Sequence, residues 1–359
     1  MGVQETNLKA IADAIKAKTG ETGVIKASEF ASRIGTIETG IDTSDATAGA
    51  SDVVSGLTGY ANNQKVIGTL VPIEKPRWTQ TTMPASEYWN SVCYGNGKFV
   101  AVAANSNIAA YSTDGITWTQ TTLPDSIRWN SVCYGNGKFV AVANSSNIAA
   151  YSTDGITWTQ TTMPASTTWQ SVCYGNGKFA TIANSNIAAY STDGITWTQA
   201  TLPASIRGIS VCYGNGKFVS VAINSNIAAY STDGITWTQT TLPDSIRWNS
   251  VCYGNGKFVA VAANSNIAAY STDGITWTQT TMPVSEYWYS VCYGNGKFVA
   301  VTGSSNIAAY STDGITWTRA TLPASKYWIS VCYGNGKFVA VAINTDIAAY
   351  LKDSFDSWA

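Results

Sequence analysis

Seven copies of one unit of about 40 residues occupy most of this chain and limit the folds open to it. The third copy is one residue shorter than the others. The copies begin near Ala85, Asp125, Ala165, Ala204, Asp244, Val284 and Ala324. A short period repeated this closely is typical of solenoids and propellers, in which each unit packs against its neighbours.

Each copy contains four runs with strand character, which in the first copy are residues 90–94, 98–103, 108–112 and 116–122. Asn96-Gly97 and Asp114-Gly115 separate runs one from two and three from four, and both dipeptides favour hairpins whose central residues have positive φ. The second run is apolar on both faces, so neighbouring copies must cover both sides of each sheet. The pattern predicts an all-β fold, a seven-bladed β-propeller of four-stranded antiparallel blades, over residues 76–359. A small α/β segment precedes it.

The two ends of the repeat region predict that the ring closes on itself. The segment Trp78–Pro84 duplicates a fourth strand ahead of the first full copy, and the last copy loses the pattern after Tyr350. We therefore expect the early strand to complete the sheet of the last blade, with residues 353–358 as a cap on that blade.

Composition excludes several classes of function. Charged residues make up 12% of the chain and the formal net charge is -1, so nothing favours nucleic acid or an acidic membrane surface as a partner. We expect no signal peptide and no membrane insertion. Histidine is absent and the seven cysteines recur once per copy in an S-V-C-Y context, which favours small buried side chains over a disulfide framework. No metal and no cofactor is expected.

The segment S-T-D-G-I-T-W, as in Ser112–Trp118, recurs six times and resembles the Asp-box of sialidase-type propellers, with one residue missing between Asp and Gly. In that family the box is a structural hairpin, so the resemblance implies a fold and not an activity. A sialidase also needs a unique arginine cluster, whereas Arg128, Arg207 and Arg247 occupy equivalent positions of three copies, as copying would give. The interpretation is therefore that the protein is not an enzyme.

Residues before the propeller predict an amphipathic helix over 6–19, with Leu8, Ile11 and Ile15 on one face, and a second helix over 28–34. This stretch and the one that follows it to residue 70 resemble two modules of tail proteins from phages and prophages of Gram-positive bacteria. The resemblance implies a helical attachment module over residues 1–40 and a small tail-associated module with a linker over 41–75. It also implies a location on the virion tail after synthesis in the bacterial cytoplasm, contacts with other tail proteins through residues 1–70, and a possible homo-oligomer.

Comparison of the copies with one another points to one rim of the ring. The first-to-second and third-to-fourth turns share a rim that is nearly invariant, while the remaining connections share the other rim and collect most of the differences. Lys98 and Asp114, with their equivalents, are expected to form surface ion pairs on the invariant rim. Loops on a rigid scaffold are the usual place for recognition, and aromatic planes beside polar groups suit sugars. The candidate ligand-binding residues are Tyr88, Trp89, Arg128, Trp129, Trp169, Arg247, Trp248, Tyr287, Trp288, Tyr327 and Trp328.

Two interpretations of these tryptophans stay open. They could stack on a ligand, or they could be buried between blades, with the variation around them marking positions that nothing selects. In the fourth copy Gly208 replaces the tryptophan. The functional hypothesis is a lectin-like, receptor-binding tail protein that recognises bacterial surface glycans through repeated weak sites. The alternatives are a structural spacer of the tail without a ligand and, less favoured, a glycan hydrolase.

Overall fold

The computed structural model describes residues 9–16, 58–61, 64–67, 77–203, 206–223 and 225–352. One compact unit spans Pro76–Ser354, and Met1–Lys75 belong to another. In the Met1–Lys75 unit, residues 9–16 are helical, which agrees with the middle of the helix predicted over 6–19. Ala12 and Ile15 are the buried residues of this helix. Strands β1 (Thr58–Ala61) and β2 (Gln64–Ile67) form an antiparallel hairpin. The predicted helix over 28–34 and the cap over 353–358 lie outside the described residues.

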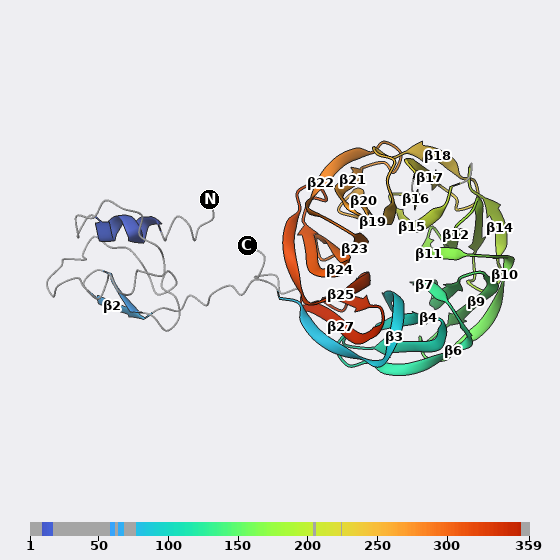
Figure 1. The fold of residues 1–359 in the computed structure, drawn as a ribbon, viewed down its shortest axis with the longest axis horizontal. Coiled ribbons are helices and arrows are strands. Elements are labelled where there is room, and N and C mark those ends of the chain that lie inside the picture. Colours follow the sequence, from blue (N-terminus) through green and yellow to red (C-terminus); the bar gives the residue numbers. More distant parts are fainter. Residues whose placement is uncertain are drawn as a thin grey trace. The chain divides into compact units, whose positions relative to one another are not determined.

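The larger unit is a β-propeller whose blades are four-stranded antiparallel sheets arranged around an axis (Figure 1). Four of its sheets are separate. Their strands are β7 (Trp129–Gly135), β8 (Lys138–Ala143), β9 (Ser146–Ser152) and β10 (Thr159–Thr167); β11 (Trp169–Gly175), β12 (Lys178–Ala183), β13 (Ile187–Ser191) and β14 (Thr198–Thr201); β15 (Gly208–Gly214), β16 (Lys217–Ala222), β17 (Ile227–Ser231) and β18 (Thr238–Thr241); and β19 (Trp248–Gly254), β20 (Lys257–Ala262), β21 (Ser265–Ser271) and β22 (Thr278–Glu286).

The remaining strands form one continuous nine-stranded sheet, because two long strands, Thr318–Gly334 and Thr79–Gly95, bend from one blade into the next. A third long strand, Lys297–Ser311, supplies the second and third strands of a single blade. Each of these long strands pairs with different partners through its two halves. The nine strands are β23 (Trp288–Gly294), β24 (Lys297–Ser311), β25 (Thr318–Gly334), β26 (Lys337–Ala342), β27 (Thr345–Lys352), β3 (Thr79–Gly95), β4 (Lys98–Ala104), β5 (Ser106–Ser112) and β6 (Thr119–Ile127).

The predicted ring closure is confirmed. The first half of β3 pairs antiparallel with β27, with Thr79 opposite Tyr350 and Thr82 opposite Ile347, while its second half pairs with β4. One strand thus serves as the outer strand of the last blade and the inner strand of the first.

The inner strands are joined around the axis by a repeated contact. The hydroxyl of Ser91 accepts a hydrogen bond from the backbone N–H of Val132 at 3.1 Å, and seven such bonds occur among the described residues, the last from Val92 to Ser330. A glycine ends each inner strand so that a tyrosine of the next blade can lie over it. A Cβ added to Gly95 would lie 2.0 Å from Cγ of Tyr134.

The turns on the invariant rim differ in type. At Asn96-Gly97 both residues have positive φ, 46° and 74°, as a primed turn requires. At Asp114-Gly115 only the glycine has positive φ, because the Asp114 carboxylate instead accepts hydrogen bonds from the backbone N–H groups of Ile116 and Thr117. The fourth strand of this copy consequently begins at Thr119 and not at residue 116, which corrects the predicted boundary.

Apolar clusters between blades form the core. In one cluster Val100 and Val102 of β4 pack with Trp129, Phe139 and the neighbouring strands of the next blade. On the other face of β4, Phe99 and Ala101 pack with Val339 of β26. Adjacent blades therefore cover both faces of the second strand, as its sequence predicts.

Candidate functional site

The rim opposite the invariant turns, here called the variable rim, is built from three positions of each copy. The first position directly precedes the tryptophan that begins the inner strand, the second directly follows it, and the third follows the second strand. A backbone hydrogen bond joins the third position to the first, as from Asn144 to Arg128 at 2.8 Å, so the side chains of one copy meet here. In chain order the first positions are Tyr88, Arg128, Thr168, Arg207, Arg247, Tyr287 and Tyr327. The second are Asn90, Asn130, Gln170, Ile209, Asn249, Tyr289 and Ile329, and the third Ala104, Asn144, Asn184, Ile223, Ala263, Gly303 and Ile343.

The six tryptophans proposed as stacking residues are buried. Their indoles have no exposed surface and belong to the apolar clusters between blades, and their N–H groups donate to a backbone carbonyl four residues earlier, as from Trp129 to Asp125 at 3.1 Å. The prediction that Trp89, Trp129, Trp169, Trp248, Trp288 and Trp328 stack on a ligand is corrected accordingly. Because the indole N–H already has a backbone acceptor, burying the large apolar ring system stabilises the fold at no cost in hydrogen bonding.

The fourth copy, which lacks this tryptophan, also has a filled core at the equivalent place. Gly208 stands where the other copies have tryptophan, and Ile206, 1% exposed, enters the core cluster with Ile182. A Cβ on Gly208 would lie 2.8 Å from Cδ1 of Ile182, so the vacated space is filled.

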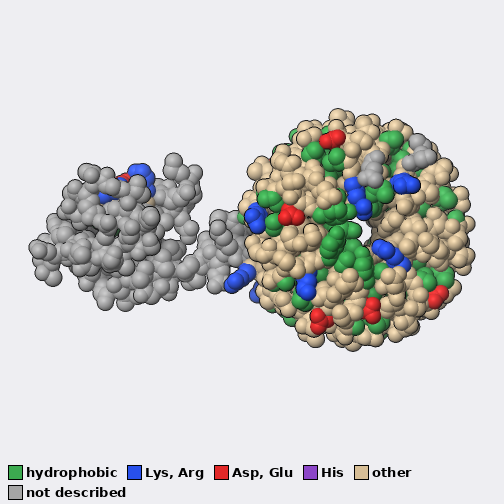
Figure 2. Space-filling model, in the orientation of Figure 1, with side chains coloured by type: hydrophobic (Ala, Val, Ile, Leu, Met, Phe, Trp, Pro, Cys, Tyr) green, Lys and Arg blue, Asp and Glu red, His purple; other side chains and the backbone are tan. Residues whose placement is uncertain are grey.

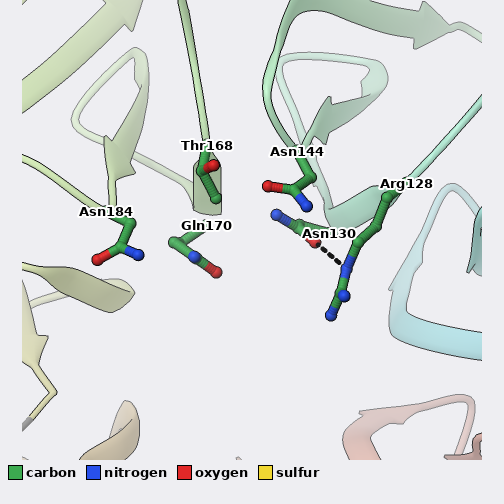
Figure 3. A pocket seen from close by; sticks show the side chains of 6 residues that line it. All are labelled: Arg128, Asn130, Asn144, Thr168, Gln170 and Asn184. Carbon is green, nitrogen blue, oxygen red and sulfur yellow. Dashed lines mark hydrogen bonds between the residues drawn. The ribbon is translucent and has the colours of Figure 1, made fainter.

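A polar cavity of about 270 Å³ lies on the variable rim between two neighbouring blades (Figure 3). Arg128, Asn130 and Asn144 come from one blade. They face Thr168, Gln170 and Asn184, the same three positions of the next blade. All six lining side chains are polar, and none carries a negative charge. The variable rim therefore contains one cavity in which two sets of the three positions meet.

Hydrogen bonds fix part of this lining and leave the rest free for a ligand. Arg128 Nε donates to Asn130 Oδ1 at 3.2 Å, and Asn130 Nδ2 donates to the Trp169 carbonyl at 2.7 Å. The hydroxyls of Ser145 and Thr168 are 3.1 Å apart. Among the described residues the side-chain amides of Gln170 and Asn184 make no hydrogen bond, and amides offer both donors and acceptors.

The guanidinium of Arg128 is held in place without a carboxylate. It lies 5.5 Å from the ring centroid of Tyr88, a cation–π geometry, and no ion pair involves it within the described part of the chain. Figure 2 shows Lys and Arg side chains bordering the central opening on the face drawn, with Asp and Glu side chains further out. The cavity therefore offers one positive charge among neutral hydrogen-bonding groups.

Three copies further along, the equivalent positions carry different chemistry. Arg247 repeats the arrangement of Arg128, donating to Asn249 Oδ1 at 2.8 Å and lying 5.6 Å from the Tyr287 ring. Tyr287, Tyr289 and Gly303 stand at the positions that Thr168, Gln170 and Asn184 hold in the polar cavity. The Tyr287 and Tyr289 centroids are 5.1 Å apart, and those of Tyr289 and Tyr327 are 6.0 Å apart.

The carboxylates of the repeated S-T-D-G-I-T-W segments, here called the box aspartates, have a structural role on the invariant rim. Burial raises the pKa of Asp193, but hydrogen bonds from the backbone of Ile195 and Thr196 and from the Ser191 hydroxyl outweigh it and lower the pKa to about 2. Asp114 is held in the same way and forms no ion pair with Lys98, so the predicted surface ion pairs are wrong for this pair. A carboxylate that accepts three turn donors stabilises the turn and is poorly suited to proton transfer.

The seven cysteines are free thiols on the inner strands, and Cys93 and Cys133 pack beside the interblade clusters. Burial raises the pKa of each thiol well above its usual value, with a smaller contribution at Cys93 from Cys332 of the adjacent blade. A protonated thiol is a weak nucleophile. No group of three metal-ligating side chains occurs in the described ranges, and no helix described here is long and apolar enough to cross a membrane.

Comparisons with known proteins agree on the fold. The DUF6242 beta propeller domain family matches residues 125–241, about a third of the chain. No curated protein sequence matches. The virginiamycin B lyase of Staphylococcus aureus is similar in structure, with a TM-score of 0.70 at 13% identity, covering 77% of this chain and 99% of the lyase.

Two further solved structures are similar in fold. YCF48 from Cyanidioschyzon merolae has a TM-score of 0.60 at 13% identity over 77% of this chain and 98% of its own. The WD40 beta propeller domain of Doa1 has a TM-score of 0.61 at 15% identity over 80% of this chain and 99% of its own. At these identities the likeness defines a β-propeller and assigns no activity.

Of the six cavity residues, only Arg128 is among the candidates that the sequence suggested as ligand contacts. Asn144 and Thr168 fall in the variable connections of the same rim but were not candidates, and neither were Asn130, Gln170, Asn184 and Tyr289. A signal for some of these exists in the repeats. Gln170 and Tyr289 each occur in one copy only at the second position, and Gly303 in one copy only at the third, whereas Asn184 shares its residue type with Asn144. The departure of the first three from the other copies could have identified them, once the pairing of neighbouring blades was considered.

Proposed function

We propose that this protein is a non-catalytic, lectin-like receptor-binding protein of a phage tail, which recognises bacterial surface glycans through the variable rim. The observation that carries the proposal is the polar cavity between the blades that begin at Trp129 and Trp169. Its lining of amides, a hydroxyl and a guanidinium supplies donors and acceptors in the density that sugar hydroxyls require. The cavity is smaller than typical drug-sized sites, so a single sugar residue is the unit proposed.

Further elements of the proposal concern architecture. Four separate sheets and the three four-stranded groups within the nine-stranded sheet add up to seven, the number of blades that we propose. The repeated box belongs, in this proposal, to the Asp-box type. Of the surviving candidate residues, Tyr88, Arg128, Arg247, Tyr287 and Tyr327 remain proposed ligand contacts on the variable rim.

The absence of catalysis is proposed on chemical grounds. The fold resembles that of a lyase, and a histidine-to-alanine variant of that lyase is described as catalytically inactive. The 359 residues of this chain contain no histidine. The box aspartates are committed to turns, and the thiols are protonated. A purely structural spacer of the tail is the second candidate, favoured by the uniformity of the invariant rim.

A panel of immobilised bacterial surface polysaccharides and oligosaccharides tests the proposal. The full chain should bind a subset of the panel, and Arg128→Gln should weaken that binding about tenfold or more, because a hydrogen bond to a charged group contributes about 1.5–3 kcal/mol. Lys98→Gln, on the invariant rim, is the matched control and should bind normally. Binding to no member of the panel, or equal loss in both variants, contradicts the proposal and favours the spacer.

The tail location rests on the resemblance of residues 6–70 and is tested separately. Antibodies against the propeller should label the tails of intact particles from an induced lysogen that carries the gene. Labelling that is absent, or confined to particle heads, contradicts the location while leaving the glycan proposal in place.

A further inference from the structure

The tyrosine cluster on the variable rim, Tyr287, Tyr289 and Tyr327, is here called the tyrosine platform. Tyr287 and Tyr289 occupy the places that Thr168 and Gln170 hold in the polar cavity, and Tyr327 comes from the blade that follows. The Tyr287 and Tyr289 rings are inclined by 32°, and Tyr289 meets Tyr327 edge to face at 70°. These rings form a contiguous aromatic surface contributed by two neighbouring blades.

Gly303 is required by these rings and not by the backbone. A Cβ at this position would lie 2.7 Å from Cδ2 of Tyr289 and 2.9 Å from Cε1 of Tyr327, closer than such contacts occur. Gly303 is not among the residues with positive φ, so its conformation is open to other residues. The other copies have alanine, asparagine or isoleucine there. The sixth copy therefore carries two linked departures, a tyrosine at the second position and a glycine that makes room for it.

The platform is only partly covered by protein. Tyr327 is 39% exposed, one of two large hydrophobic side chains in the described residues that are exposed to this degree. The hydroxyls of the three tyrosines make no hydrogen bond among the described residues. Burial raises the pKa of Tyr289 to about 12, with a smaller contribution from Tyr287, so its hydroxyl stays protonated and able to donate at neutral pH.

Polar groups stand at the edge of this aromatic surface. The Arg247 guanidinium lies over Tyr287, and its Nε is held by Asn249, which fixes its position. A ligand that suits this arrangement has a flat apolar face for the rings and hydroxyls along its edge for the phenols and the guanidinium. A pyranose ring has both, whereas an aromatic side chain of a protein has at most one edge hydroxyl, that of tyrosine, and would leave most of these donors unmatched.

We propose that the tyrosine platform is a second ligand subsite, on which one pyranose ring of a surface glycan stacks through its C–H face. The inference rests on the proposed function in taking a glycan as the ligand. It goes further by assigning a stacking subsite to the tyrosine platform. The platform and the polar cavity occupy equivalent positions of different copies, yet the proposal gives them different roles in binding.

Three variants and two measurements test the subsite, with the oligosaccharide that binds best in the panel as the probe. Tyr327→Ala removes the exposed ring, Gly303→Ala displaces two rings without removing either, and Tyr327→Phe removes a hydroxyl only. Calorimetry gives the dissociation constant, and proton NMR gives the upfield shift that aromatic rings impose on sugar C–H protons lying over them. Thermal unfolding of each variant shows whether it folds.

The expected result is that Tyr327→Ala and Gly303→Ala weaken binding by roughly 2- to 10-fold, in line with the contribution of one aromatic contact, and abolish the upfield shift. Tyr327→Phe keeps the shift. Arg128→Gln weakens binding but leaves the shift intact, which separates the two subsites.

A probe that binds, depends on Arg128, and shows neither an upfield shift nor any loss in folded Tyr327→Ala and Gly303→Ala overturns the stacking subsite while leaving the proposed function standing. Binding of a free aromatic amino acid or a tyrosine-rich peptide in place of the sugar, with the same dependence on Tyr327, also overturns it. Failure of the wild-type chain to bind any glycan overturns the proposed function together with this inference.

Discussion

The two rims of the propeller are made by the same repeats but follow different rules. On the invariant rim, the box aspartates bond within their own turns, and Asn-Gly turns also bond to a neighbouring blade, as Asn96 Nδ2 does to the Thr153 carbonyl at 3.4 Å. On the variable rim, the residues at the three positions vary among the copies, and some amides and hydroxyls make no hydrogen bond among the described residues. The turns at one end of each blade can therefore stabilise the ring while the residues at the other end vary, because a substitution on one rim does not change the hydrogen bonds of the other.

The sharpest test of this division lies at two adjacent residues. Trp129→Ala should lower the free energy of unfolding by about 3–5 kcal/mol, because it empties a buried site in an interblade cluster. Arg128→Ala, one residue earlier and half-buried on the surface, should change it by less than about 1 kcal/mol. Urea denaturation of both variants measures the difference. Similar losses would mean that the variable rim is as much a part of the core as the tryptophan.

On the invariant rim, Gly135→Ala should destabilise the ring by about 1–3 kcal/mol or more, because the new Cβ would lie 2.0 Å from Cγ of Tyr174 in the next blade. Gly137→Ala is the matched control. No atom lies within 4 Å of its Cβ, and only its φ of 74° opposes the change, so a loss of about 1 kcal/mol is expected. An equal loss in the two variants would show that the tyrosine moves aside freely.

Lowering the pH should destabilise the fold mainly through the invariant rim. The six box aspartates have pKa values lowered in the folded state, to about 2 at Asp193 and Asp273. A lowered folded pKa contributes stability above the unfolded value of about 4, and that stability is lost as the pH falls toward 2. The melting temperature should fall between pH 5 and pH 2. In Asp193→Asn the decrease should be smaller, by the contribution of one of the six carboxylates. A melting temperature that is constant over this range would contradict the hydrogen-bonded role of the boxes.

The smallest effect on stability is expected on the variable rim. Asn184→Ala removes an exposed amide that makes no hydrogen bond in the described structure, so the free energy of unfolding should stay within about 0.5 kcal/mol of the wild type. The same variant should weaken binding of the glycan probe. A loss of stability in this variant, with binding unchanged, would reverse the roles assigned to the two rims.

The sequence allowed the strand order, the ring closure and the two rims to be predicted, because these follow from periodicity, from the duplicated strand at Trp78–Pro84 and from the turn dipeptides. It misplaced the start of the fourth strand, since the hydrogen bonds of Asp114 hold residues 113–117 in a longer turn. It left the exposure of the tryptophans open, because Trp129 satisfies its N–H through the backbone of its own copy. The repeats alone do not show the cavity, since Asn144 and Asn184 lie 40 positions apart in the chain and line one cavity only when blades are placed side by side.

The shared strand β3 has a consequence for biosynthesis. Thr79 leaves the ribosome early, yet its partner Tyr350 is among the last described residues to appear, so the outer half of β3 stays an unpaired edge while every intervening blade is made. The nascent ring is thus a spiral with two complementary ends, and translation of β27 is the event that fastens it. Until then the same open edge can pair with β27 of another chain, so slow completion of β27 would favour chains linked end to end over closed monomeric rings.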